Sequence, residues 1–177
     1  MNAIKGTMLA MALGLLGTAG CGDKVTTAAA TLMSPTGSPL GTVTITQTGS
    51  AQQVQVAIAL TGAPAGKHGA HLHDVGKCDP PDFMTAGGHF NPTGQMHGDP
   101  NQNIHHSGDF GNIDVGADGT GTLSVTTTTL SLSSDQVTYA ANHAFIIHQS
   151  ADDLVTQPTG NSGARIACGI IPAPSGG

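Results

Sequence analysis

The side chains best suited to chemistry in this sequence are its nine histidines, three of which lie in the stretch HGAHLHDVGKC, residues 68–78. His71 and His73 are two positions apart in an apolar run, and residues at that spacing on a β-strand point to the same face. Two imidazoles that converge on one point could hold a metal ion, although an isolated pair is weak support for a site. His68 would face the other way, and we expect it to bond to backbone near the site.

Further candidate ligands follow in a region rich in glycine, proline and asparagine. It contains His89, His97 and His106, and the motif HSGD places Asp109 three residues after the last of these. His148 ends the apolar run HAFIIH, so we expect it at the end of a strand. All-imidazole sites suit copper and mixed imidazole–carboxylate sites suit zinc, so the ligand types point to these metals.

The elements that must position these side chains are predicted to be strands. All 11 acidic residues are Asp and Lys plus Arg total five, so the helix formers Glu, Lys and Arg are scarce. Residues 53–58 alternate polar and apolar side chains, as a strand with one wet face does. We predict an all-β antiparallel sandwich or barrel of eight strands. The strand-like runs are residues 30–35, 40–47, 52–60, 69–73, 111–115, 121–130, 143–148 and 164–171.

Two segments interrupt this rhythm, residues 74–108 and residues 149–165. The first holds three of the candidate ligands, His89, His97 and His106, and shows no strand pattern. Loops of this length inside a compact domain are uncommon and usually functional. We therefore expect the chemistry to lie where these two loops meet the strands.

The first residues have the features of an export signal. Lys5 precedes an apolar stretch that is too short to span a bilayer and long enough for the core of a signal peptide. The motif TAGC is similar to a lipobox, in which the cysteine, here Cys21, carries lipid and becomes the mature N-terminus. An ordinary secreted protein, cleaved near the same place without lipid, is the alternative. We predict a signal peptide over residues 1–20, a tether over residues 21–30 and one domain over residues 31–177.

These features predict a periplasmic or other extracytoplasmic location, with the N-terminal lipid holding the protein to a membrane surface. If Cys21 carries lipid, Cys78 and Cys168 remain as an even pair in an oxidising compartment. The net charge is −6 and no basic patch is present, which predicts no nucleic-acid partner.

The chain resembles the copper/zinc superoxide dismutases from about residue 30 to residue 171. The motifs HGAHLH, GGHFNP, HSGDFGN, IIHQSADDL and GNSGARIACGII appear in the family's order and at its spacings. The resemblance implies an eight-stranded Greek-key barrel, with the two long loops forming the metal site. It also implies that the substrate is superoxide, which a copper cycling between two oxidation states converts to O₂ and H₂O₂. Dimers are common in the family, so a homodimer is one expected assembly, although no strand face selects its surface.

The resemblance further assigns ligands for one copper and one zinc per subunit. Copper would be held by His71, His73, His89 and His148, and zinc by His89, His97, His106 and Asp109. His89 would bridge the two metals and deliver a proton to the product. His105 is a rival to His106, but the spacing to His97 and to Asp109 favours His106.

Four other residues match family positions outside the ligand set. Asp152 would link a copper-ligand histidine to a zinc-ligand histidine and orient both rings. Arg165 would attract and position superoxide through a charge-assisted hydrogen bond. Cys78 and Cys168 would form the disulfide within the subunit. His105 and His143 have no role in the resemblance, and Asp153 is expected to cap a turn.

One departure concerns the path of the anion. Relatives often carry lysines in the loop before the arginine, whereas residues 149–164 contain none and include Asp152 and Asp153. Steering would then depend on Arg165 and the metals, which predicts a rate below that of the fastest relatives.

Two other functions compete with dismutation. A non-catalytic copper or zinc carrier would be expected to lack a ligand or the arginine, and this chain has the full set. A zinc hydrolase needs an open coordination position, which a site with four protein ligands does not offer.

Overall fold

The computed structural model describes residues 24–49 and 53–176. Their strands are β1 (Val25–Met33), β2 (Pro39–Thr48), β3 (Val54–Leu60), β4 (Gly66–His73), β5 (Asp109–Val115), β6 (Gly121–Thr127), β7 (Ala144–His148), β8 (Arg165–Ile170) and β9 (Ser175–Gly176). A short 3₁₀ helix, η1 (Met84–Ala86), is the only helix among the described residues. None of them forms a helix long and apolar enough to cross a membrane.

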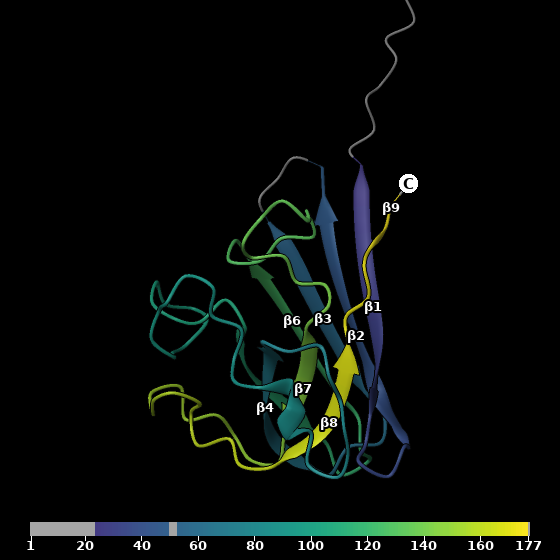
Figure 1. The fold of residues 1–177 in the computed structure, drawn as a ribbon. Coiled ribbons are helices and arrows are strands. Elements are labelled where there is room, and N and C mark those ends of the chain that lie inside the picture. Colours follow the sequence, from purple (N-terminus) through teal and green to yellow (C-terminus); the bar gives the residue numbers. More distant parts are fainter. Residues whose placement is uncertain (1–23, 50–52, 177) are drawn as a thin grey trace, which may run out of the picture.

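The eight longer strands form one antiparallel sheet in the order β5-β4-β7-β8-β1-β2-β3-β6, and β9 pairs with β1 (Figure 1). The pairs β3–β6 and β4–β7 join strands that are not consecutive in the chain, as Greek-key connections do. β5 and β6 stand at the two ends of this path, and a turn in which Gly116 N donates to Thr120 O at 2.8 Å joins them. The sheet therefore curls into a nearly closed barrel, and the all-β prediction is confirmed.

The structure corrects the predicted start of the domain and some of the predicted strand limits. β1 begins at Val25, so residues 25–30 belong to the sheet and not to the predicted tether. Small Ala and Thr residues gave little hydrophobic signal there, but their pairing with β2 and the burial of Ala28 place them in the barrel wall. β9 was not predicted, and β6 ends at Thr127, before the predicted residue 130. The predicted signal peptide and Cys21 lie outside the described residues.

The barrel core is built from the inward residues of alternating strands. In β3, Val54, Val56, Ile58 and Leu60 are buried while the residues between them are exposed, as the alternating pattern predicts. β4 and β7 differ, because from His68 onward in β4 and throughout β7 every residue is buried. These two strands must therefore be covered on their outer face as well.

The long loops provide that cover. A second hydrophobic cluster joins Phe83 and Ala86 of the first loop to Ala144 and Ile146 of β7 and to Cys168 of β8. Figure 1 shows the loop after β4 and the loop between β7 and β8 extending on the same side of the barrel. The candidate site thus lies on the outside of the barrel wall, beneath two loops.

Candidate metal centre

Strand geometry brings the first three candidate ligands to one outer face. Ala70 and Leu72 of β4 point into the barrel core, so His71 and His73 between and after them point outward. On the neighbouring strand, Ile146 pairs with His71, and His148 lies two residues further along on the same face. The predictions that His71 and His73 share a face and that His148 lies at the end of a strand are therefore confirmed.

Four buried histidines form the first group, which we call the four-histidine cluster: His71, His73, His89 and His148. One ring nitrogen of each lies within 4.8 Å of the others. His73 donates from Nδ1 to Gly87 O at 2.9 Å and His148 from Nδ1 to Gly163 O at 3.2 Å, which turns their Nε2 atoms inward, 3.3 Å apart. His89 is brought in from the long loop by an isolated bridge to His73.

The second group, the mixed cluster, adds a carboxylate and consists of His89, His97, His106 and Asp109. Asp109 Oδ1 lies 2.8 Å from His89 Nδ1 and 3.4 Å from His106 Nδ1, and its Oδ2 lies 3.0 Å from His97 Nδ1. Asp109 begins β5 and pairs with His71 of β4, so the strand ladder ties this group to the first. Its four residues are also buried.

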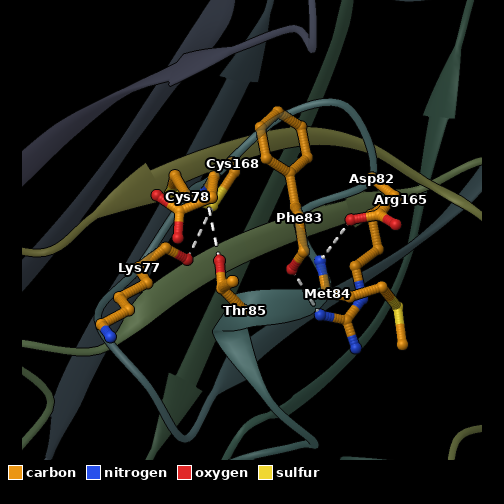
Figure 2. The surroundings of a disulfide bond; sticks show 9 residues. Lys77, Cys78, Asp82, Phe83, Met84, Thr85, Arg165 and Cys168 are labelled. Carbon is orange, nitrogen blue, oxygen red and sulfur yellow. Dashed lines mark hydrogen bonds between the residues drawn. A yellow bond between two sulfur atoms is a disulfide. The ribbon is translucent and has the colours of Figure 1, made fainter.

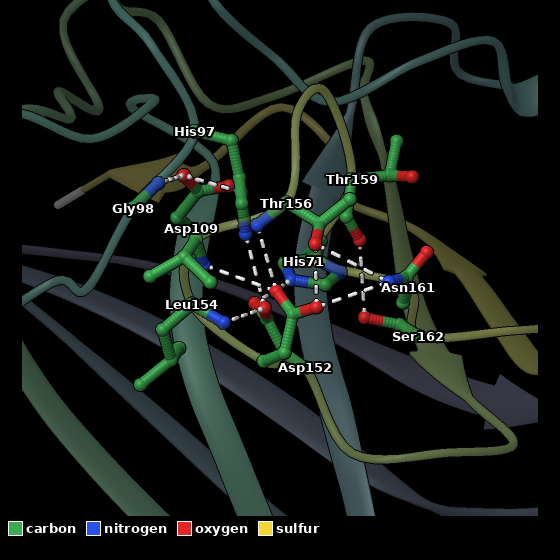
Figure 3. A network of polar contacts seen from close by, with 12 residues as sticks. His71, His97, Gly98, Asp109, Asp152, Leu154, Thr156, Thr159, Asn161 and Ser162 are labelled. Atoms are coloured by element: carbon green, nitrogen blue, oxygen red, sulfur yellow. Dashed lines mark hydrogen bonds and ion pairs between the residues drawn. The ribbon is translucent and has the colours of Figure 1, made fainter.

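Asp152 connects the two groups from the second loop (Figure 3). Its Oδ2 accepts from His71 Nε2 at 2.8 Å and its Oδ1 accepts from His97 Nε2 at 3.0 Å. Its backbone is held by Asn112 of β5, which accepts from Asp152 N at 2.7 Å and donates to Asp152 O at 2.9 Å. A carboxylate on the outer nitrogen of each ring fixes the tautomer and leaves the other nitrogen for a metal.

The two clusters contain ring nitrogens that are available to bind a metal ion. Among the described residues, three buried side-chain nitrogen or oxygen atoms lack a hydrogen-bond partner: His71 Nδ1, His89 Nε2 and His97 Nδ1. All three are ring nitrogens of the two clusters, and the third lies 3.0 Å from Asp109 without hydrogen-bond geometry. Each unsatisfied buried polar atom costs about 1–3 kcal/mol of folding free energy. A cation bound by these nitrogens would remove that cost.

Burial prepares the four-histidine cluster for a cation. It lowers the pKa of His89 to about 4 and that of His148 to about 3. Burial and the nearby His89 also hold the pKa of His73 well below its usual range. These rings are neutral at pH 7, which is the form that binds metal.

The mixed cluster has the opposite electrostatic character. Burial opposes the change, but the carboxylates of Asp109 and Asp152, which face the two ring nitrogens, raise the pKa of His97 to about 9. Burial tends to raise the pKa values of Asp109 and Asp152. Hydrogen bonds from His106 to Asp109 and from His71 to Asp152 nevertheless keep both pKa values well below the usual range. Without a metal, His97 therefore carries a proton that a cation at Nδ1 would displace.

Arg165 is held next to the four-histidine cluster by two backbone carbonyls. Its Nη1 donates to Phe83 O at 2.7 Å and its Nη2 donates to Gly87 O at 2.6 Å, the same carbonyl that accepts from His73. Its charge lies close enough to lower the pKa values of His73 and His148. These carbonyls use two of the five guanidinium N–H groups.

A disulfide joins the loop that supplies these carbonyls to β8, which Arg165 begins. Cys78 and Cys168 are bonded, with their Cα atoms 5.7 Å apart, as the resemblance implies (Figure 2). The bridge and the second hydrophobic cluster hold the loop against the strand on both sides of Phe83.

The remaining histidines stay outside both clusters. The ring nitrogens of His68 lie 2.8 Å from His148 O and 2.9 Å from Pro64 O, so its predicted bonding to backbone is confirmed. His105 Nδ1 donates to the carbonyl of His106, and His143 Nδ1 donates to Asp74 O. The choice of His106 over His105 is therefore supported by position.

Residues 40–171 match the profile of a protein family described as copper/zinc superoxide dismutase (SODC). The chain is a member of the copper/zinc superoxide dismutase family. It is also 36% identical to the superoxide dismutase-like protein YojM of Bacillus subtilis (strain 168), over 93% of this chain and 94% of that protein.

Several solved structures share the fold. A SOD-like protein from Bacillus subtilis matches with a TM-score of 0.72 and 36% identity, covering 81% of this chain and 97% of that chain. Its double mutant, in which a tyrosine and a proline are replaced by histidines, matches with a TM-score of 0.74 and 37% identity, over 81% of this chain and 96% of that chain. The clock protein EA4 has a TM-score of 0.69 at 29% identity, over 85% of this chain and 94% of that chain.

Proposed function

We propose that this member of the superoxide dismutase family is an active dismutase with one copper and one zinc per subunit. Copper would be bound by the four-histidine cluster, and zinc by the mixed cluster, with His89 shared between them. The observation that carries the proposal is the set of three unpartnered buried ring nitrogens, all in these clusters. Four imidazoles suit copper, and three imidazoles with a carboxylate suit zinc.

Copper, when bound, supplies the one-electron chemistry by which two superoxide ions and two protons become O₂ and H₂O₂, whereas zinc has no redox chemistry of its own. Arg165 would bind the anion beside the four-histidine cluster, because its half-buried guanidinium is already oriented by Phe83 O and Gly87 O. A preorganised cation loses little freedom when the anion arrives.

His89 would hold and pass on a proton at Nε2. This atom is buried and unpartnered, while Nδ1 faces Asp109 of the mixed cluster. A ring fixed on one side by the zinc ligands can gain or lose a proton on the other side without moving. Asp152 accepts a hydrogen bond from His71 at 2.8 Å and another from His97 at 3.0 Å, and it thereby fixes the relative position of the two clusters.

The second candidate function is that of a non-catalytic metal carrier. It is considered because the Bacillus subtilis relative is named superoxide dismutase-like. The presence of all seven clustered ligands together with Arg165 favours the enzyme. Only turnover separates the two, since a carrier would bind the same metals.

The test is superoxide dismutation by purified protein loaded with both metals. We expect activity that disappears in His148→Ala and falls sharply in Arg165→Ala. The matched controls are His143→Ala, a histidine outside both clusters, and Lys67→Ala, an exposed cation that pairs with Asp114 at 3.6 Å. Full metal occupancy with no turnover would favour the carrier.

We further propose the location that the first residues indicate, an exported protein held to a membrane by lipid on Cys21, with superoxide as its small-molecule partner. The apolar stretch after Lys5 and the TAGC motif support it. Mass spectrometry of the mature N-terminus distinguishes lipidated Cys21 from simple cleavage, and light scattering of the soluble domain distinguishes a homodimer from a monomer.

A further inference from the structure

Gln157 reaches from the loop between β7 and β8 to the backbone of His97, 60 residues earlier in the chain. Its Nε2 donates to His97 O at 2.8 Å, and its Oε1 accepts from His97 N at 2.9 Å. One side chain therefore satisfies both backbone polar groups of one residue in the mixed cluster. A two-point bond of this kind fixes orientation as well as distance.

His97 needs such support more than the strand-borne ligands do. The backbones of His71, His73 and His148 are paired in β4 and β7, whereas His97 lies in no helix or strand. Its side chain is nevertheless fully buried, with Nδ1 3.0 Å from Asp109 Oδ2 and Nε2 3.0 Å from Asp152 Oδ1. The two bonds to Gln157 take the place of a strand ladder at this ligand.

The segment that carries Gln157 is itself a braced turn. Asp153 Oδ1 accepts from Val155 N at 3.0 Å and from Thr156 N at 2.8 Å, which confirms its expected role in capping a turn. Asp153 Oδ2 accepts from Thr156 Oγ1 at 2.7 Å and from Asn161 Nδ2 at 3.1 Å. Figure 3 draws Thr156 and Asn161 of this turn in the network around Asp152. Gln157 therefore extends from an ordered base and not from a free loop.

We propose that Gln157 is a positioning residue for zinc, which sets the His97 ring between Asp109 and Asp152 before the metal binds. It touches no metal itself and acts only through the backbone of His97. The proposal rests on the part of the proposed function that places zinc in the mixed cluster, and it does not require dismutation. Removal of an outer partner of a metal ligand typically lowers metal affinity by about 10- to 100-fold.

The test is Zn²⁺ affinity of the metal-free full domain, measured by competition with a chromophoric chelator. Gln157→Met keeps the length and bulk of the side chain but removes both hydrogen bonds, and we expect affinity to fall by about 10- to 100-fold. Gln157→Glu still accepts from His97 N but cannot donate to His97 O, so its affinity should lie between those of Met and wild type. Gln136→Met, at an exposed glutamine in the connection between β6 and β7 and outside both clusters, is the matched control and should bind Zn²⁺ as wild type does.

A second readout separates positioning from general folding. Co²⁺ bound in the mixed cluster reports ligand geometry in its visible spectrum, and we expect Gln157→Met to change that spectrum while Gln136→Met does not. Wild-type Zn²⁺ affinity and an unchanged Co²⁺ spectrum in Gln157→Met would overturn the inference, as would an equal loss of melting temperature with and without Zn²⁺. Tight Zn²⁺ binding without dismutation in the wild type would contradict the proposed enzyme and leave this inference standing.

Discussion

Replacement of Asp152 by asparagine should weaken copper binding far more than zinc binding. The carboxylate accepts hydrogen bonds at both oxygens, and the two oxygens are not equivalent. Oδ1 accepts from His97 Nε2 at 3.0 Å and from Leu154 N at 2.7 Å, whereas Oδ2 accepts from His71 Nε2 at 2.8 Å. An asparagine has one acceptor oxygen, which satisfies more donors in the Oδ1 position. Its NH₂ group would then face His71.

The expected size of the effect follows from the bond that is lost. An NH₂ group opposite His71 Nε2 favours the tautomer with the proton on Nδ1, the nitrogen that is buried and unpartnered in the four-histidine cluster. A hydrogen bond to a charged group contributes about 1.5–3 kcal/mol, which corresponds to about a 10- to 150-fold change in affinity. We expect Cu²⁺ affinity to fall by this factor, and Zn²⁺ affinity to change much less because His97 keeps its acceptor.

The assay is chelator competition for each metal on separately loaded protein. Asp152→Ala removes both acceptors and should weaken both metals, whereas Asp135→Asn changes the same charge at an exposed turn and should weaken neither. A larger loss for zinc than for copper in Asp152→Asn would show that the assignment of acceptors, and with it the tautomer of His71, is wrong.

Three further predictions concern the anion, the proton and the disulfide. Arg165→Ala should weaken azide binding to the copper-loaded protein in optical titrations. Asp82→Asn should strengthen it, because the negative charge of Asp82 interacts with Arg165 and opposes a second anion there. Weaker azide binding in Asp82→Asn would contradict that picture. Since the pKa of His97 is about 9 in the metal-free protein, Zn²⁺ binding at pH 7.5 should release about one proton from it, and Zn²⁺ affinity should rise with pH until about pH 9. Calorimetry in buffers of different ionisation enthalpy measures that proton, and no release from this ring would refute its protonated state. Reduction of Cys78–Cys168, which closes a loop with a sequence separation of 90, should lower the free energy of unfolding by about 4–5 kcal/mol in chemical denaturation. It should also lower the dismutation rate, and an unchanged rate would show that Arg165 is held without the bridge.

The candidate ligands could be named from the sequence because their side chains are chemically distinctive, and for those on β4 and β7 the strand pattern also predicts their placement. His71 and His73 illustrate this, since the spacing alone predicts a shared face and β4 confirms it. The strand at residues 25–30 was missed because a run of small Thr and Ala residues resembles a linker until its pairing partner in β2 is known.

The supports of the site were harder to foresee for a different reason. Phe83 O and Gly87 O hold Arg165 through backbone atoms, which every residue type possesses. Gln157 and Asn112 bind the backbones of residues 60 and 40 positions away, so no local pattern marks them. Such contacts depend on how two loops meet, and that is decided by the tertiary fold.

The central claim, that these clusters form a catalytic site, is tested most directly by following superoxide decay after pulse radiolysis in protein with measured metal content. We predict decay that is catalytic, proportional to bound copper, lost in zinc-loaded protein stripped of copper, and lost in His148→Ala but not in His143→Ala. Protein with copper and zinc bound at full stoichiometry that leaves superoxide decay at its uncatalysed rate would contradict the account.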